Sequence, residues 1–133
     1  MPSEVCLRLP ANASATAATR CFVEAVLDRW EMPGAVMDAQ IIATELVENV
    51  LRHTSGGGEL RLRHRPGMVL IEVADDSDTL PKVVESEDYT RANGRGLRMV
   101  RVISRDWGVR LKSPGKVVWA ELEVCSWSGD GPG

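Results

Sequence analysis

Apolar residues recur at helical spacing in two segments of the first half of the chain. The more regular segment runs from about residue 35 to residue 54, and its steps of three or four predict a helix with one buried face. That face carries Ala35, Ala39, Ile42, Leu46 and Val50. An earlier segment, from Ser14 to Trp30, predicts a first helix that Ser14 or Thr16 caps. Its expected apolar face carries Ala18, Phe22, Ala25, Val26 and Trp30.

Alternating apolar and polar residues, bounded by turn signals such as Pro66-Gly67, predict the strands. A third helix is expected after a long segment without a regular period, with Leu97, Val100 and Ile103 as its apolar stripe. The expected strands are Val5–Leu9, Leu60–Arg65, Met68–Ala74, Trp107–Leu111 and Val117–Val124.

This order of elements predicts an α+β fold. We expect a two-layer α/β sandwich, with a mixed, mostly antiparallel sheet and three helices on one face, because the later strands are joined mainly as hairpins. The 133 residues suit one domain, which we place at residues 1–125. Residues 126–133 are rich in Gly, Ser and Pro and are expected to form a flexible tail.

Charge and cysteine content exclude several classes of protein. The net charge of −3 argues against a direct nucleic-acid binder. No apolar run reaches the ~18 residues of a membrane span, and the first residues lack the pattern of a signal peptide, so we expect a cytoplasmic protein. The three widely separated cysteines lack metal-binding spacing and are expected to be free, buried thiols. They are Cys6, Cys21 and Cys125.

The predicted second helix carries an acid and an amide one turn apart. Glu45 and Asn49 are at i and i+4, so their side chains stack on one helix face. A carboxylate there can take a proton from an attacking hydroxyl group. An amide oxygen can ligate Mg²⁺, which prefers oxygen donors. The alternative is an ordinary solvated helix face.

Two further features suit a nucleotide. Asp75 ends a buried strand, where its carboxylate can accept a hydrogen bond from an exocyclic amine such as that of adenine; the alternative is a turn residue. Gly94-Arg95-Gly96 opens a helix, whose backbone N–H groups and dipole favour phosphate; the alternative is a simple turn. Residues 76–93 between them form a long acidic loop, and such loops are usually functional or disordered.

In this order, the motifs resemble those of the histidine-kinase-like ATPase superfamily (GHKL, with the Bergerat-type ATP-binding fold). Thr44–Thr54 is similar to its N-box, Val73–Pro81 to its first glycine box in a variant with serine, and Gly94–Val100 to its second glycine box. The resemblance covers about residues 14 to 124. The resemblance is strongest to the small, single-domain members of the superfamily, namely the anti-sigma-factor serine kinases and the related actinobacterial regulatory ATP-binding proteins.

The resemblance implies ATP and Mg²⁺ as cofactors and assigns roles to individual residues. Glu45 is implied to be the catalytic general base and Asn49 the Mg²⁺ ligand. Asp75 is implied to accept the adenine amino group, Arg95 to reach a phosphate, and residues 76–93 to cover ATP as a lid. The implied cofactor-binding positions are Asn49, Asp75, Ser77, Gly94, Arg95, Gly96 and Leu97.

The implied function is that of a serine/threonine protein kinase in transcription regulation. Its implied partners are an anti-sigma antagonist of the STAS type and a sigma factor, and homodimers are frequent in the family. The alternative is a non-catalytic binding module of the same fold, with weak or no nucleotide binding. Ser77 and Thr79 favour it, because they replace glycines of the first glycine box. Val117 also favours it, at a place where many members have a threonine that helps to bind an adenine-linked water.

Overall fold

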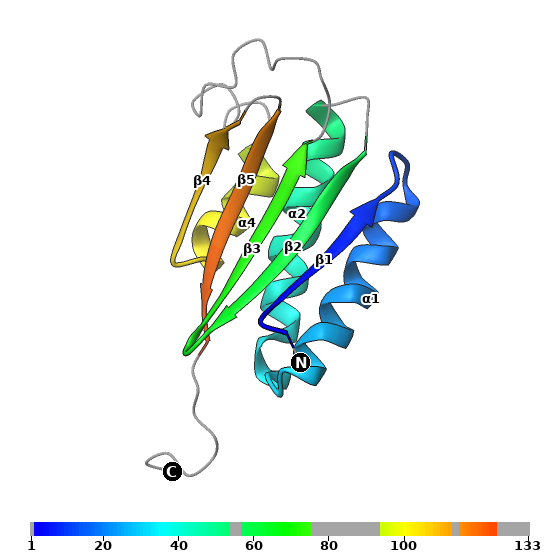
Figure 1. The fold of residues 1–133 in the computed structure, drawn as a ribbon. Helices are drawn as coiled ribbons and strands as arrows, with labels where there is room; N and C mark the ends of the chain where they lie inside the picture. The colour runs from blue at the N-terminus through cyan, green and yellow to red at the C-terminus, as the bar shows by residue number, and fades with distance from the viewer. Residues whose placement is uncertain (1, 54–56, 76–93, 113–114, 125–133) are drawn as a thin grey trace.

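The computed structural model describes residues 2–53, 57–75, 94–112 and 115–124, with the backbone alone described at residues 52–53 and 94–98. Five strands form one antiparallel sheet in the order β1-β2-β3-β5-β4. Figure 1 shows helices α1, α2 and α4 together on one face of this sheet, which confirms the predicted α+β sandwich. The elements are β1 (Glu4–Leu9), α1 (Ser14–Arg29), the 3-10 helix η1 (Pro33–Ala35), α2 (Val36–His53), β2 (Gly58–Arg65), β3 (Met68–Asp75), α4 (Gly94–Ile103), β4 (Asp106–Leu111) and β5 (Lys116–Glu123).

Helix α2 lies at the centre of the helical layer and packs against α1, α4 and the sheet. The apolar face predicted for it is confirmed, because every residue of that face is buried. Leu46 and Ile42 are wholly buried, and full burial of one such side chain favours folding by about 1.5–3 kcal/mol. The next face around the helix, which carries Glu45 and Asn49, is therefore held in a fixed orientation.

The face predicted for α1 is confirmed only in part. Val26 is buried and Phe22 and Trp30 are partly buried against the core, whereas Ala25 is exposed. The buried residues of this helix are Ala15, Thr19, Val23, Val26 and Leu27. Thr19 can be buried because its hydroxyl group donates to the carbonyl oxygen of Ala15 at 2.7 Å. The predicted cap also differs, since Asn12 Oδ1 accepts a hydrogen bond from the backbone N–H of Ser14 at 2.9 Å.

The cysteines depart from the expectation in their burial. Cys6 and Cys21 are free thiols, as predicted, but both are exposed rather than buried. Cys6 lies on β1 at the edge of the sheet, on the face away from the helices, and Cys21 lies on the outer side of α1. Cys125 and the predicted tail lie outside the described residues.

The described ranges hold neither a cluster of metal-ligating side chains nor a membrane-spanning helix. No group of three or more His, Cys, Asp and Glu side chains gathers there to hold a metal ion. None of the helices in that part of the chain is long and apolar enough to cross a bilayer.

One end of the sheet brings several elements together. In Figure 1 the last turns of α2, the end of β3 and the start of β5 lie at the same end of the molecule. The strand register pairs Asp75 with Gly58 of β2 on one side and with Lys116 of β5 on the other. A Cβ atom on Gly58 would lie 3.9 Å from Val50 Cγ1 of α2. The end of α2 is thus packed directly over this end of the sheet.

Gly115 permits the close approach of β5 to the end of β3. Its φ is +90°, and a Cβ atom at this position would lie 2.2 Å from the carbonyl oxygen of Asp75. We therefore expect Gly115→Ala to lower the unfolding free energy by roughly 2 kcal/mol or more, from the strained backbone and the overlap. Urea denaturation measures this loss. The control is Gly34→Ala, because no atom lies within 4 Å of a Cβ there, and equal midpoints for the two variants would contradict the expectation.

Candidate functional site

The amide of Asn49 is buried without a hydrogen bond in the described structure. The residue is 2% exposed, and neither Oδ1 nor Nδ2 has a hydrogen-bond partner among the described residues. The solvated-face alternative is therefore wrong for Asn49. Glu45, one turn earlier on α2, is half-buried.

An unsatisfied buried amide opposes folding, since each such polar group costs about 1–3 kcal/mol. Most buried polar groups are hydrogen-bonded, and an exception suggests a ligand or another function. The Asn49 oxygen is a suitable ligand for a hard cation such as Mg²⁺, and its N–H groups can donate to a phosphate oxygen. The residues present therefore fit a magnesium-nucleotide complex.

Asp75 lies on the helix-facing side of the sheet. Alternate residues of a strand point to the same side, and Ile71 and Val73 of β3 are wholly buried on that side. It is 2% exposed, so it is not a solvated turn residue. Its Oδ2 accepts a hydrogen bond from Lys116 Nζ of β5 at 3.0 Å, and the Lys116 side chain is itself only 1% exposed. The candidate adenine acceptor therefore belongs to a buried ion pair.

Sequence reasoning missed Lys116. A lysine beside a turn is usually a surface residue, and lysine is almost never fully buried unless it is paired. The signal that identifies the pair is the register of β3 with β5, which places Lys116 directly opposite Asp75. That register depends on where the turn between β4 and β5 falls, and the alternation of β5 alone does not fix it.

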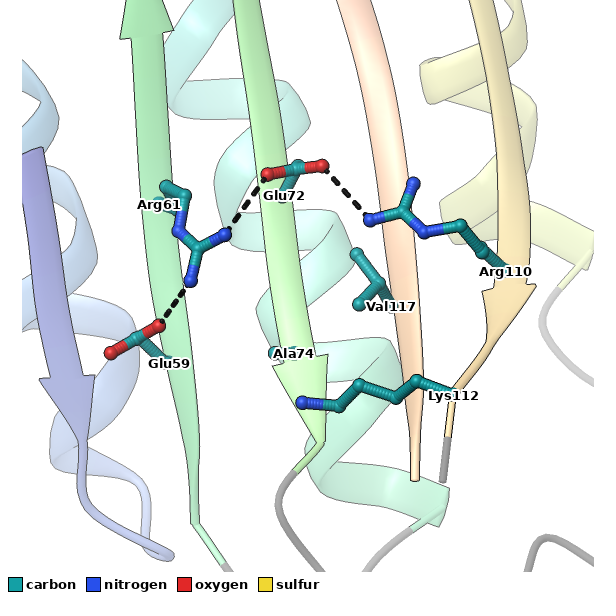
Figure 2. A pocket seen from close by; sticks show the side chains of 7 residues that line it. All are labelled: Glu59, Arg61, Glu72, Ala74, Arg110, Lys112 and Val117. Carbon is teal, nitrogen blue, oxygen red and sulfur yellow. Dashed lines mark hydrogen bonds and ion pairs between the residues drawn. The ribbon is translucent and has the colours of Figure 1, made fainter. Parts of the chain in front are cut away.

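Val117, compared above with a threonine near adenine, lies on the other face of β5. It lines a cavity of about 200 Å³ on the sheet face opposite the helices, as Figure 2 shows. The residue opposite Asp75 on β5 is Lys116 instead. The cavity is lined by Glu59, Arg61, Glu72, Ala74, Arg110, Lys112 and Val117.

The cavity of Figure 2 is built around an ion-pair network centred on Glu72. One carboxylate oxygen of Glu72 lies 3.3 Å from Arg110 Nη2, and the other lies 3.8 Å from Arg61 Nη1. Arg61 also bonds Glu59 at 2.9 Å, and a hydrogen bond with the Cys6 side chain raises the pKa of Arg61. Ion pairs thus link Glu72 to arginines on both sides of it. Among the residues that the structure describes, none of those predicted for the nucleotide site lines this cavity.

Helix α4 begins at Gly94, as the glycine pattern predicted. It packs against α2, with Val100 wholly buried. The backbone N–H groups of the first turn have no partner within a helix, and the helix dipole gives this end a partial positive charge. The side chains of Arg95 and Leu97 are not described, and Ser77 and Thr79, with the predicted lid at 76–93, lie outside the described residues.

The structure thus brings together the residues that the sequence placed far apart. The end of α2 with Asn49 and the end of β3 with Asp75 are packed together through Val50 and Gly58. The first turn of α4 lies on the same side of the sheet, since α4 packs on α2. In this arrangement the amide suits a bound metal ion, the carboxylate suits the purine base, and the helix N-terminus suits the phosphates.

The chain matches a known protein family over most of its length. The family described as the histidine kinase-like ATPase domain matches residues 9–122, which include Glu45, Asn49, Asp75 and the first turn of α4. No curated protein sequence matches the chain.

Proposed function

The chain belongs to the histidine kinase-like ATPase family, and from this premise we propose that it is a Mg²⁺- and ATP-dependent serine/threonine protein kinase of the anti-sigma-factor type. The family assignment makes it a regulatory ATP-binding protein. The observation that carries the finer proposal is the amide of Asn49, which is buried, unbonded among the described residues and one helical turn from Glu45.

The proposed roles follow from the chemistry of each group. Asn49 holds Mg²⁺, and the bound ion neutralises phosphate charge during transfer. Asp75 accepts a hydrogen bond from the purine amino group, and the N–H groups of Gly94, Gly96 and Leu97 bind phosphate oxygens. Glu45 accepts the proton of the attacking hydroxyl group.

The proposed phosphate acceptor is a serine or threonine on a partner protein, namely an anti-sigma antagonist of the STAS type, and the alternative partner is a sigma factor. A phosphate adds about −1.5 to −2 charges at neutral pH, which is enough to disrupt or create a protein interface. Phosphorylation would thereby decide which partner the protein holds, and so regulate transcription in the cytoplasm without direct contact to nucleic acid.

The experiment is phosphate transfer from radiolabelled ATP. The purified chain is incubated with [γ-³²P]ATP, Mg²⁺ and a STAS-type acceptor, and the label on the acceptor is followed with time. Label on a serine or threonine of the acceptor is the expected result. An unlabelled acceptor that nevertheless binds the chain tightly would contradict the kinase.

A non-catalytic binding module is the second candidate. The observation that favours it is the pairing of Asp75 with Lys116, because the carboxylate proposed to bind adenine is already engaged. The same transfer experiment separates the two candidates, since only the kinase moves label to a partner.

A further inference from the structure

The buried ion pair between Lys116 and Asp75 is the least expected polar contact of the helix-facing side of the sheet. Lys116 Nζ and Asp75 Oδ2 are 3.0 Å apart, and the two side chains are 1% and 3% exposed. The residues are 41 positions apart in sequence and are held opposite each other by the register of β3 with β5. Gly115 keeps the backbone of β5 against the carbonyl of Asp75.

This pair changes how a purine can use Asp75. A base that displaced Lys116 would leave a buried ammonium group without its carboxylate, which is strongly unfavourable. A base that shares the carboxylate leaves Lys116 in place, with its ammonium beside the edge of the ring that carries the amino group. Sharing is therefore favoured over displacement.

We propose that Lys116 is a specificity-determining residue of the purine site, which stays on Asp75 and donates a hydrogen bond to the ring nitrogen, N1 or N7, that flanks the 6-amino group. This inference rests on the proposed function. Adenine places a donor, its amino group, beside an acceptor nitrogen, and the protein offers a carboxylate beside an ammonium group. In the same pose a 6-keto purine would place an oxygen acceptor against the carboxylate, so this pose favours adenine.

The experiment compares nucleotide analogues that lack one ring nitrogen. ATP, 1-deaza-ATP and 7-deaza-ATP are titrated into the full chain by calorimetry, with 3-deaza-ATP as the control because N3 lies across the ring from the amino group. We expect either 1-deaza-ATP or 7-deaza-ATP to bind at least about tenfold more weakly than ATP. Lys116→Met removes the donor. In this variant we expect the loss of affinity for that analogue, relative to ATP, to fall to about threefold or less.

A structural role alone gives a different result. If Lys116 served only as a counter-ion for Asp75, Lys116→Met would weaken the binding of ATP and of every analogue by the same factor. The analogue penalty, which is the dissociation constant of the analogue divided by that of ATP, would then be unchanged, and that result would overturn the proposal. So would a wild-type protein that binds ATP but shows no loss with either analogue. If the wild-type protein bound no ATP at all, the proposed function itself would fail. ATP binding by the wild-type protein therefore tells a failure of this inference from a failure of the proposed function.

A second variant covers the case in which Lys116→Met does not fold. Lys116→Gln keeps a neutral N–H donor for Asp75 and a side chain of similar length. Because a neutral donor bonds more weakly than an ammonium group, its analogue penalty is expected to lie below that of the wild type. A penalty equal to that of the wild type would contradict the proposal. Thermal unfolding followed by circular dichroism confirms that each variant is folded.

Discussion

Replacing Asn49 with leucine is expected to make the protein more stable and, at the same time, to weaken its binding of Mg²⁺-ATP. Both polar atoms of this amide are buried without a hydrogen-bond partner in the described structure. An apolar side chain of similar size removes that unfavourable burial, which is worth about 1–3 kcal/mol. The same change removes the proposed Mg²⁺ ligand, and we expect affinity to fall roughly 10- to 100-fold, the equivalent of a lost contact to a charged group.

The measurement pairs urea denaturation with calorimetric titration of ATP, with and without Mg²⁺. Gln40→Leu is the matched control, because Gln40 is an amide of the same helix whose Nε2 donates to the carbonyl oxygen of Arg20 at 3.1 Å. That variant loses a hydrogen bond and is expected to keep full ATP affinity. A less stable Asn49→Leu protein with unchanged Mg²⁺-dependent binding would contradict the role of Asn49.

Replacing Glu45 with glutamine is expected to slow phosphate transfer by about two to four orders of magnitude and to leave ATP binding intact. Removal of a positioned general base lowers rates by about 10²- to 10⁴-fold. The amide of glutamine keeps the size of the side chain, so we expect the dissociation constant for Mg²⁺-ATP to change by less than about threefold. Single-turnover transfer to the acceptor gives the rate, and calorimetry gives the affinity.

Glu48→Gln is the control for this prediction. Glu48 lies on the same helix, but its Oε2 accepts a hydrogen bond from the hydroxyl group of Thr16 in α1 at 3.3 Å. Since Glu48 packs toward α1, transfer by this variant should match that of the wild type. Equal rates in Glu45→Gln and in the wild type would remove Glu45 from the role of base.

The periodicity of the chain predicts the elements whose apolar faces are unambiguous. Every residue predicted for the apolar face of α2 is buried, although Ala35 lies in η1, and each strand was placed within two positions of its observed ends. The face of α1 was predicted only in part, because its apolar residues are spread around the helix. Which of them turn inward depends on α2 and the sheet, which α1 covers, and not on the local sequence. Thr19 is buried there because its hydroxyl group has a partner, Ala15, within its own helix.

The candidate site was predicted as far as local sequence defines it. The spacing of Glu45 and Asn49 shows that they share a helix face, but only tertiary packing buries Asn49 and leaves its amide unbonded. Asp75 was recognised at the end of its strand, whereas its pairing with Lys116 depends on the strand register. The side from which Val117 projects follows from the same register, and the local sequence does not fix it.

The most direct measurement of the central claim is a calorimetric titration of the wild-type chain with ATP in the presence and absence of Mg²⁺. If Asn49, Asp75 and the start of α4 form a magnesium-nucleotide site, binding is saturable and at least about tenfold tighter with Mg²⁺ than without it. No binding at millimolar ATP, or equal affinity with and without Mg²⁺, would contradict this account.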